Sequence, residues 1–223
     1  MNRFVELAHP IRDGMTAYPG LPPAKIGALL THEESRDRYE GKAEFLLGQV
    51  ELACNTGTYL DVPFHRFRDG EDLAAISLER MAGLPGMVVE PADQDARAVR
   101  LDGLEPADVR GRAVLVRTGR SELWGTDAYW VEGPYLSGQA LDLLIEGGAV
   151  LVGVDFGNVD DTGDPSRPAH TRLLGAGALI VENLTGLAAL PPDGFTFFAV
   201  ALRIEEGAAF PVRAFAVLPD ATG

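Results

Sequence analysis

Short runs of apolar residues recur along the chain, and segments rich in glycine, proline and charged residues separate them. Short apolar runs bounded by turn residues are typical of β-strands. We therefore expect strands in the following segments: residues 3–8, 25–30, 45–52, 87–89, 113–119, 149–155, 178–181, 195–202 and 212–217.

The clearest helix is predicted at residues 137–148, where Ser137 is a suitable N-cap and a glycine pair marks the end. Because this helix lies between strands 113–119 and 149–155, the order predicts a parallel crossover. Shorter helical segments are expected at residues 77–81, within 91–112, and as a single turn at 171–174. The whole pattern predicts a β-rich α/β fold with few helices.

Length and charge narrow the function. A chain of 223 residues with 46% hydrophobic residues suits a single domain spanning residues 1–223. Its 19 basic and 33 acidic residues give a net charge of −14, which disfavours a nucleic-acid or anionic-membrane partner. The single Cys54 excludes an intrachain disulfide and a cysteine-based zinc site. With neither a signal-peptide pattern nor a membrane-length apolar run, we expect a cytoplasmic protein that handles a small molecule.

The candidate chemistry starts in the segment Asn55–His65, which contains Asp61 and His65 four residues apart. Downstream, a loop rich in glycine, aspartate and proline leads to His170, and Glu182 ends an apolar run. We expect these segments to meet in one site. Two carboxylates and two imidazoles suffice to bind a divalent metal, and they also suffice for proton transfer without a metal.

Aromatic residues offer candidate walls for a pocket. Tyr18 lies in a proline-rich loop, where it is either packed on the surface or placed over the site. Trp124, Tyr129 and Trp130 lie in a second loop, which suits a pocket wall or a subunit interface. We count Tyr18, Asn55 and Trp124 as candidate substrate contacts.

These segments resemble the cyclase/kynurenine formamidase family of metal-dependent hydrolases and cyclases. The family motif reads His-x-Gly-Thr-His-x-Asp-x-Pro-x-His, and the chain matches it in register at Gly57, Thr58, Asp61, Pro63 and His65. Further matches cover almost the whole chain: Leu7 to Pro19, Arg117 to Gly119, Trp124-Gly125, Val152 to Asp155, and His170 through Glu182-Asn183-Leu184. The resemblance implies a swivelling β/β/α fold with a barrel-like mixed sheet, assembled as a homodimer or homotetramer.

The chain departs from the motif at its two early histidines, which are replaced by Asn55 and Tyr59. In the family those histidines hold the primary metal together with the aspartate, and an amide or a neutral phenol is a poor zinc ligand. By resemblance, Asp61, His170 and Glu182 correspond to the ligands of the second metal. We expect a site that works without a catalytic metal or binds one divalent ion, zinc or manganese, weakly.

Three hypotheses for function follow. In the first, His65 is the general acid or base, Asp61 or Glu182 orients an imidazole, and Tyr59 and Asn55 donate to a carbonyl oxygen. That set suits ring closure, dehydration or isomerisation of a small carbonyl compound, aromatic or polyketide-like, as found in secondary metabolism.

The second hypothesis is a metal-dependent amide or lactone hydrolase, in which one ion held by Asp61, His170 and Glu182 activates water. The third is a small-molecule-binding protein that has lost catalysis. The third is disfavoured because a binding protein has no chemical need to keep Asp61, His65, His170 and Glu182.

Overall fold

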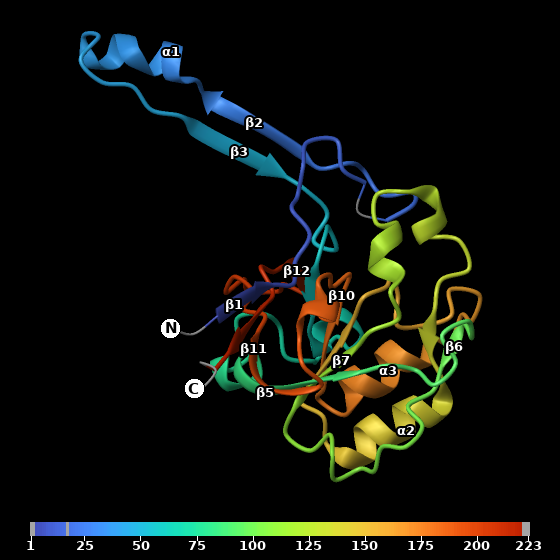
Figure 1. The fold of residues 1–223 in the computed structure, drawn as a ribbon. Helices are drawn as coiled ribbons and strands as arrows, with labels where there is room; N and C mark the ends of the chain where they lie inside the picture. Colours follow the sequence, from blue (N-terminus) through green and yellow to red (C-terminus); the bar gives the residue numbers. More distant parts are fainter. Residues whose placement is uncertain (1–2, 17, 220–223) are drawn as a thin grey trace.

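A mixed sheet of nine strands curls through the body of the protein in the computed structural model, which describes residues 3–16 and 18–219 (Figure 1). The strand order is β1-β13-β11-β5-β7-β9-β10-β4-β12. The four strands β5, β7, β9 and β10 run parallel at the centre, and antiparallel strands flank them. The bounds are β1 Arg3–Glu6, β4 Tyr59–Asp61, β5 Ala82–Val89, β7 Ala113–Val116, β9 Leu151–Val154, β10 Leu179–Glu182, β11 Asp193–Phe198, β12 Ala209–Pro211 and β13 Phe215–Leu218. The predicted β-rich α/β class with a barrel-like mixed sheet is confirmed.

Helices α2 (Gly138–Gly147) and α3 (Pro168–Gly175) cover one face of the sheet (Figure 1). The Ser137 side chain accepts a hydrogen bond from the Ala140 N–H, and Gly148 ends α2 in the left-handed conformation that glycine adopts easily. Strand β7 precedes α2 in the sequence and β9 follows it, and the two strands pair in parallel. The predicted crossover is therefore confirmed. The remaining short 3₁₀ turns are Asp37–Tyr39, Pro63–His65, Leu78–Arg80, Arg120–Leu123, Asp127–Tyr129 and Leu187–Ala189.

The central strands are buried on both faces and divide the apolar residues between two cores. In β7, Val114 and Val116 pack toward the helices, whereas Ala113 and Leu115 pack inside the curl of the sheet. This division follows from the alternation of side chains along a strand. The side chains of strand β10 alternate in the same way. Ile180 and Glu182, two residues apart, both face α3.

Strands β2 (Lys25–Leu30) and β3 (Leu47–Glu51) form a separate hairpin, with the short helix α1 (His32–Arg36) at its tip. This arm extends away from the curled sheet (Figure 1). Its apolar side chains are largely exposed, including Leu29 at 63% and Val50 at 58%. A lone two-stranded hairpin is only marginally stable in water. A second layer packed against the arm would stabilise it.

The structure corrects several local predictions. No helix forms in residues 91–112: this segment is a proline- and glycine-interrupted excursion that contains only the short strand β6 (Ala98–Val99), paired with β8 (Tyr135–Leu136). The segment expected to be a helix at 77–81 is only a 3₁₀ turn, and the strand expected at 87–89 already begins at Ala82. The single turn predicted at 171–174 belongs to the longer α3, because Pro168 is well suited to start a helix.

Within the described ranges, no helix is both long enough and apolar enough to cross a membrane. The cytoplasmic location stays a prediction from the sequence.

Candidate active site

The site starts at the antiparallel pairing of β4 with β10. The register places Tyr59 directly opposite Glu182 and Asp61 opposite Ile180. Residues two apart in a strand share a face, so Tyr59 and Asp61 point the same way, while Leu60 between them fills the core inside the curl. The strand pairing therefore gathers a phenol and two carboxylates under α3.

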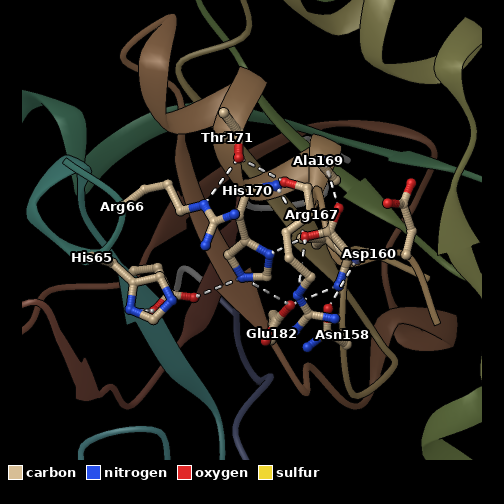
Figure 2. A network of polar contacts seen from close by, with 12 residues as sticks. His65, Arg66, Asn158, Asp160, Arg167, Ala169, His170, Thr171 and Glu182 are labelled. Carbon is tan, nitrogen blue, oxygen red and sulfur yellow. Dashed lines mark hydrogen bonds and ion pairs between the residues drawn. The ribbon is translucent and has the colours of Figure 1, made fainter. Parts of the chain in front are cut away.

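Helix α3 brings His170 onto this cluster. Its Nε2 lies 3.7 Å from Asp61 Oδ2 and 3.6 Å from Glu182 Oε1. Its other ring nitrogen, Nδ1, donates to Asp160 Oδ2 at 2.6 Å, because an ionised carboxylate can only accept. Figure 2 shows His170 at the centre of the network, with His65 and Arg66 on one side and Asp160 and Arg167 on the other. The predicted meeting of the two segments is confirmed.

The two strand carboxylates are fully buried, and their oxygens differ in what they contact. Asp61 Oδ1 accepts from the Asn55 side-chain amide at 3.3 Å, whereas Asp61 Oδ2 has no hydrogen-bond partner among the described residues. Glu182 Oε2 accepts from the Tyr59 hydroxyl, and Glu182 Oε1 accepts from the Val159 N–H at 2.7 Å. A buried carboxylate oxygen without a partner is costly, so the Asp61 oxygen calls for a cation or a donor.

Asp61, His170 and Glu182 fit a divalent ion. One ligand atom from each lies within 4.8 Å of the others. Ligand atoms about 2.1 Å from a tetrahedral ion lie about 3.4 Å apart, which is close to the spacing around His170 Nε2. Proteins commonly orient a metal-binding imidazole with a carboxylate on its other nitrogen, and Asp160 has that position here. The chemistry of the donor set thus supports one ion at this place.

A second ion does not fit the residues present. The side chains at the two early motif positions, Asn55 and Tyr59, donate to the outer oxygens of Asp61 and Glu182. An amide N–H and a phenol O–H each use a lone pair of these carboxylates, and neither group is a good zinc ligand. That these positions do not hold the primary metal stays a prediction.

Burial and charge shift the pKa values of the cluster. Burial acts to lower the pKa of His170, but the hydrogen bond with Asp160 and the charges of Asp61 and Glu182 outweigh it and raise that pKa to about 10. Burial raises the pKa of Glu182, and the charge of Asp61 adds to the rise. Burial, followed by the neighbouring carboxylates, raises the pKa of Tyr59 well above its ordinary value, so its hydroxyl keeps its proton.

His65 lies at the edge of the buried cluster, on the 3₁₀ turn that follows β4. Its Nδ1 is 3.7 Å from Asp61 Oδ1, its side chain is 34% exposed, and its ring centroid is 5.5 Å from that of His170. Burial lowers the pKa of His65, and the charge of Asp61 opposes this only in part. A neutral imidazole therefore borders open space next to the candidate ligands.

That open space is a cavity of about 210 Å³. Its lining consists of Tyr18, Leu21, Asn55, Tyr59, His65, Arg66, Asn158, Arg167 and His170. Tyr18 and Asn55 thus border the space beside His65, where the sequence predicted substrate contacts. Their contact with a substrate stays a prediction.

Trp124 lies elsewhere. Its ring stacks on His9 with centroids 4.1 Å apart, and it borders a neighbouring hollow together with Trp130. Trp130 in turn packs edge-on against Tyr18, with ring centroids 5.2 Å apart. The aromatic loop therefore packs against Tyr18 in the cavity wall. A direct substrate contact by Trp124 stays a prediction.

Sequence reasoning missed Asp160. It is one of several aspartates in a loop that was interpreted only as a connection to His170, and no spacing singled it out. In the structure Asp160 is 3% exposed and accepts from the Ala169 N–H at 2.5 Å as well as from the His170 ring. It therefore fixes both the start of α3 and the orientation of the imidazole.

Asn183 was also missed as a site residue, although it directly follows Glu182. It adopts a left-handed backbone with φ of 60°, which asparagine tolerates better than most residues. Its amide donates to the Gly57 carbonyl at 2.7 Å, and its Oδ1 accepts from the Tyr129 hydroxyl at 2.7 Å. Asn183 thus ties the motif segment and the aromatic loop to the end of β10.

Comparison with known proteins gives consistent results. Residues 5–161 match the family model of the cyclases, a span that includes Asp61 and His65. The kynurenine formamidase of Salinibacter ruber is 32% identical over 186 residues, covering 82% of this chain and 84% of that protein. The kynurenine formamidase of Bacillus cytotoxicus is 25% identical over 214 residues, covering 96% of each. Isatin hydrolase A from Ralstonia solanacearum shares the fold, with a TM-score of 0.80, 24% identity, and coverage of 98% of this chain and 92% of that one.

Proposed function

The chain belongs to the cyclase family and is an enzyme, and from this premise we propose that it hydrolyses an amide or lactone bond in a small molecule, assisted by one divalent ion. Asp61, His170 and Glu182 would hold the ion. The observation that carries the proposal is the buried Asp61 Oδ2, which has no partner among the described residues and faces His170 Nε2 at 3.7 Å. The similarity to proteins named kynurenine formamidase supports hydrolysis as the reaction type.

A bound divalent ion would supply Lewis-acid polarisation of the scissile carbonyl and would make water a stronger acid. The side chains provide the proton transfers. His65, neutral and open to the cavity, accepts a proton from the attacking water and later returns it to the leaving group. Asp61 Oδ1, at 3.7 Å, stabilises the imidazolium that forms in between.

In this proposal Asn55 and Tyr59 are not ligands of the ion. They orient the carboxylates and the substrate. The Asn55 amide has two N–H donors, and the bond to Asp61 uses only one of them. The second is available to a carbonyl oxygen in the cavity that Asn55 lines. The Tyr59 hydroxyl is bound to Glu182, which keeps that carboxylate oriented.

The same two hydrogen bonds favour a second candidate function, which is ring closure, dehydration or isomerisation by acid and base groups alone. In this alternative Tyr59 would act as the acid and His65 as the base, beside the cavity that both residues line. The substrate class is again a small carbonyl compound. Membership of an enzyme family argues against the third hypothesis, a non-catalytic binding protein.

Metal analysis of the purified protein separates the two candidates. We expect about one zinc or manganese ion per chain, loss of amide hydrolysis after chelation, and recovery when either ion is returned. Asp61→Asn should abolish both metal binding and turnover, whereas the surface control Asp161→Asn should leave both intact. A chelated protein with full activity would refute the metal-assisted mechanism and favour the acid/base one.

The role of His65 has its own test. His65→Gln should lower kcat by about 10²- to 10⁴-fold, the usual contribution of a general acid or base, while metal content stays unchanged. Turnover equal to that of the unmodified enzyme would remove His65 from the mechanism.

We also propose that the chain forms homodimers or homotetramers through the arm of β2 and β3. The apolar side chains exposed on that arm would be covered by a second copy, and the hairpin would gain the packing layer it lacks.

A further inference from the structure

Among the described residues, those that line the cavity beside His65 are cationic or neutral, and none is a carboxylate. This is unexpected for a chain with 33 acidic and 19 basic residues. Asp61 and Glu182 lie beneath the cavity with no exposed surface, and neither lines it. Among the lining residues, Arg66 and Arg167 have no part in the proposed chemistry, so their presence needs another explanation.

Arg167 is held in an unfavourable backbone conformation. With φ of 49° and ψ of 59° it is left-handed, which is uncommon for a residue with a long side chain and often marks a functional position. It directly precedes α3, three residues before His170. This backbone conformation therefore sets the direction of the Arg167 side chain at the start of α3.

The Arg167 guanidinium makes no hydrogen bond to any described residue. The nearest carboxylate oxygen, Asp160 Oδ2, is 3.9 Å from its Nε and is already bonded to His170. The Arg167 side chain is 27% exposed and lines the cavity. Apart from this long contact with Asp160, its donors are available to a bound molecule.

Arg66 reaches the same region from the opposite side, next to His65 (Figure 2). It donates to the Thr171 hydroxyl at 2.9 Å and to the Ser166 carbonyl at 3.2 Å, and both acceptors are neutral. By contrast, the guanidinium of Arg172 on α3 forms an ion pair with Asp142 at 2.5 Å. The charge of Arg66 is therefore held in place but is not neutralised by any described carboxylate.

We propose that the substrate is a small carboxylic acid without an ammonium group, and that Arg66 and Arg167 bind its carboxylate. The planar guanidinium presents paired donors that match a carboxylate, and its charge is permanent. An amino acid would bring an ammonium group into a cavity where no described lining residue is a carboxylate that could receive it. This inference rests on the proposed function, because it places the scissile carbonyl of the same molecule next to His65.

The volume of about 210 Å³ limits the acid to a compact molecule. An aromatic acid with a formamide, amide or lactone group beside its carboxylate satisfies these requirements. The aromatic ring would pack against Tyr18 in the cavity wall.

Binding tests the inference without turnover. Benzoate and anthranilate, together with the matched neutral amides benzamide and 2-aminobenzamide, are titrated by calorimetry into the metal-loaded protein. We expect the acids to bind about 10- to 100-fold more tightly than the amides, as charged hydrogen bonds predict. Arg66→Gln and Arg167→Gln should each remove most of this preference, whereas Arg172→Gln should keep it. Metal content and circular dichroism, measured on every variant, identify any loss of fold.

Equal binding of acids and amides by the unmodified protein would overturn the inference, as would a preference that survives both substitutions. Failure to bind either acid would also overturn it. Turnover then separates this inference from the proposed function. N-formylanthranilate should be hydrolysed faster than its methyl ester and faster than N-formylkynurenine, which carries an ammonium group. Hydrolysis of all three at similar rates would refute the acid preference alone, and hydrolysis of none, despite bound metal, would refute the proposed function.

Discussion

Asp160→Asn isolates the contact that orients His170. Asparagine has nearly the same shape, and its side-chain oxygen can still accept from the Ala169 N–H, which lies 2.5 Å from Asp160. The start of α3 is therefore preserved. What is lost is the charged acceptor Asp160 Oδ2, which accepts from the His170 ring at 2.6 Å and from the His170 backbone N–H at 3.3 Å. The substitution thus removes the charged partner of one ligand while keeping the Ala169 hydrogen bond at the start of α3.

The expected loss is in metal affinity. Removing the partner of a metal-binding histidine typically weakens affinity by about 10- to 100-fold. That corresponds to about 1.4 to 2.7 kcal/mol, a range that agrees with the usual contribution of a hydrogen bond to a charged group. Because Asp160 is only 3% exposed, water would compensate little of this loss. We therefore expect the upper part of the range.

The measurement is a competition titration with a chromophoric chelator. Metal-free protein is prepared by chelation, and zinc and manganese are added separately. Asp161→Asn is the matched control, because Asp161 is the next residue but contacts the Gly163 N–H at 3.1 Å and Arg97 at 3.6 Å, and not His170. If Asp160→Asn binds both ions as tightly as the unmodified protein while Asp61→Asn binds neither, the positioning role assigned to Asp160 is wrong.

Three further predictions follow from the geometry. Replacing both Asn55 and Tyr59 by His should raise the bound metal from about one to about two ions per chain in elemental analysis, and unchanged stoichiometry would mean that the pocket has lost the family geometry. Gly153→Ala should reduce the free energy of unfolding in urea by about 1 to 3 kcal/mol, because the added carbon would lie 2.6 and 2.7 Å from two buried leucine side chains; an unchanged midpoint would show that the leucines move aside. Leu29→Lys combined with Val50→Lys should reduce the molecular mass measured by light scattering, whereas an unchanged oligomer would exclude the arm as the interface.

Local patterns in the sequence predicted much of the fold. The helix from Gly138 was predicted at both ends because Ser137 and Gly148 act within one turn of the backbone that they cap. The strands at the centre of the sheet were predicted because continuous apolar runs reflect burial on both faces. Asp61, His65 and His170 were chosen as candidates because carboxylates and imidazoles are the side chains that bind metals and transfer protons, and their catalytic roles stay predictions.

Only the tertiary structure decided how these residues act together. The loop before α3 contains several aspartates that the sequence does not distinguish, and packing alone selects Asp160 as the partner of His170. In the same way, Arg66 resembles any other arginine until folding places it with Arg167 in a cavity whose described lining contains no carboxylate. The arm of β2 and β3 also has ordinary strand patterns, although it leaves the body of the protein. Periodicity records which residues are apolar, whereas partners, burial and net charge at a site depend on strand register and on segments far apart in the chain.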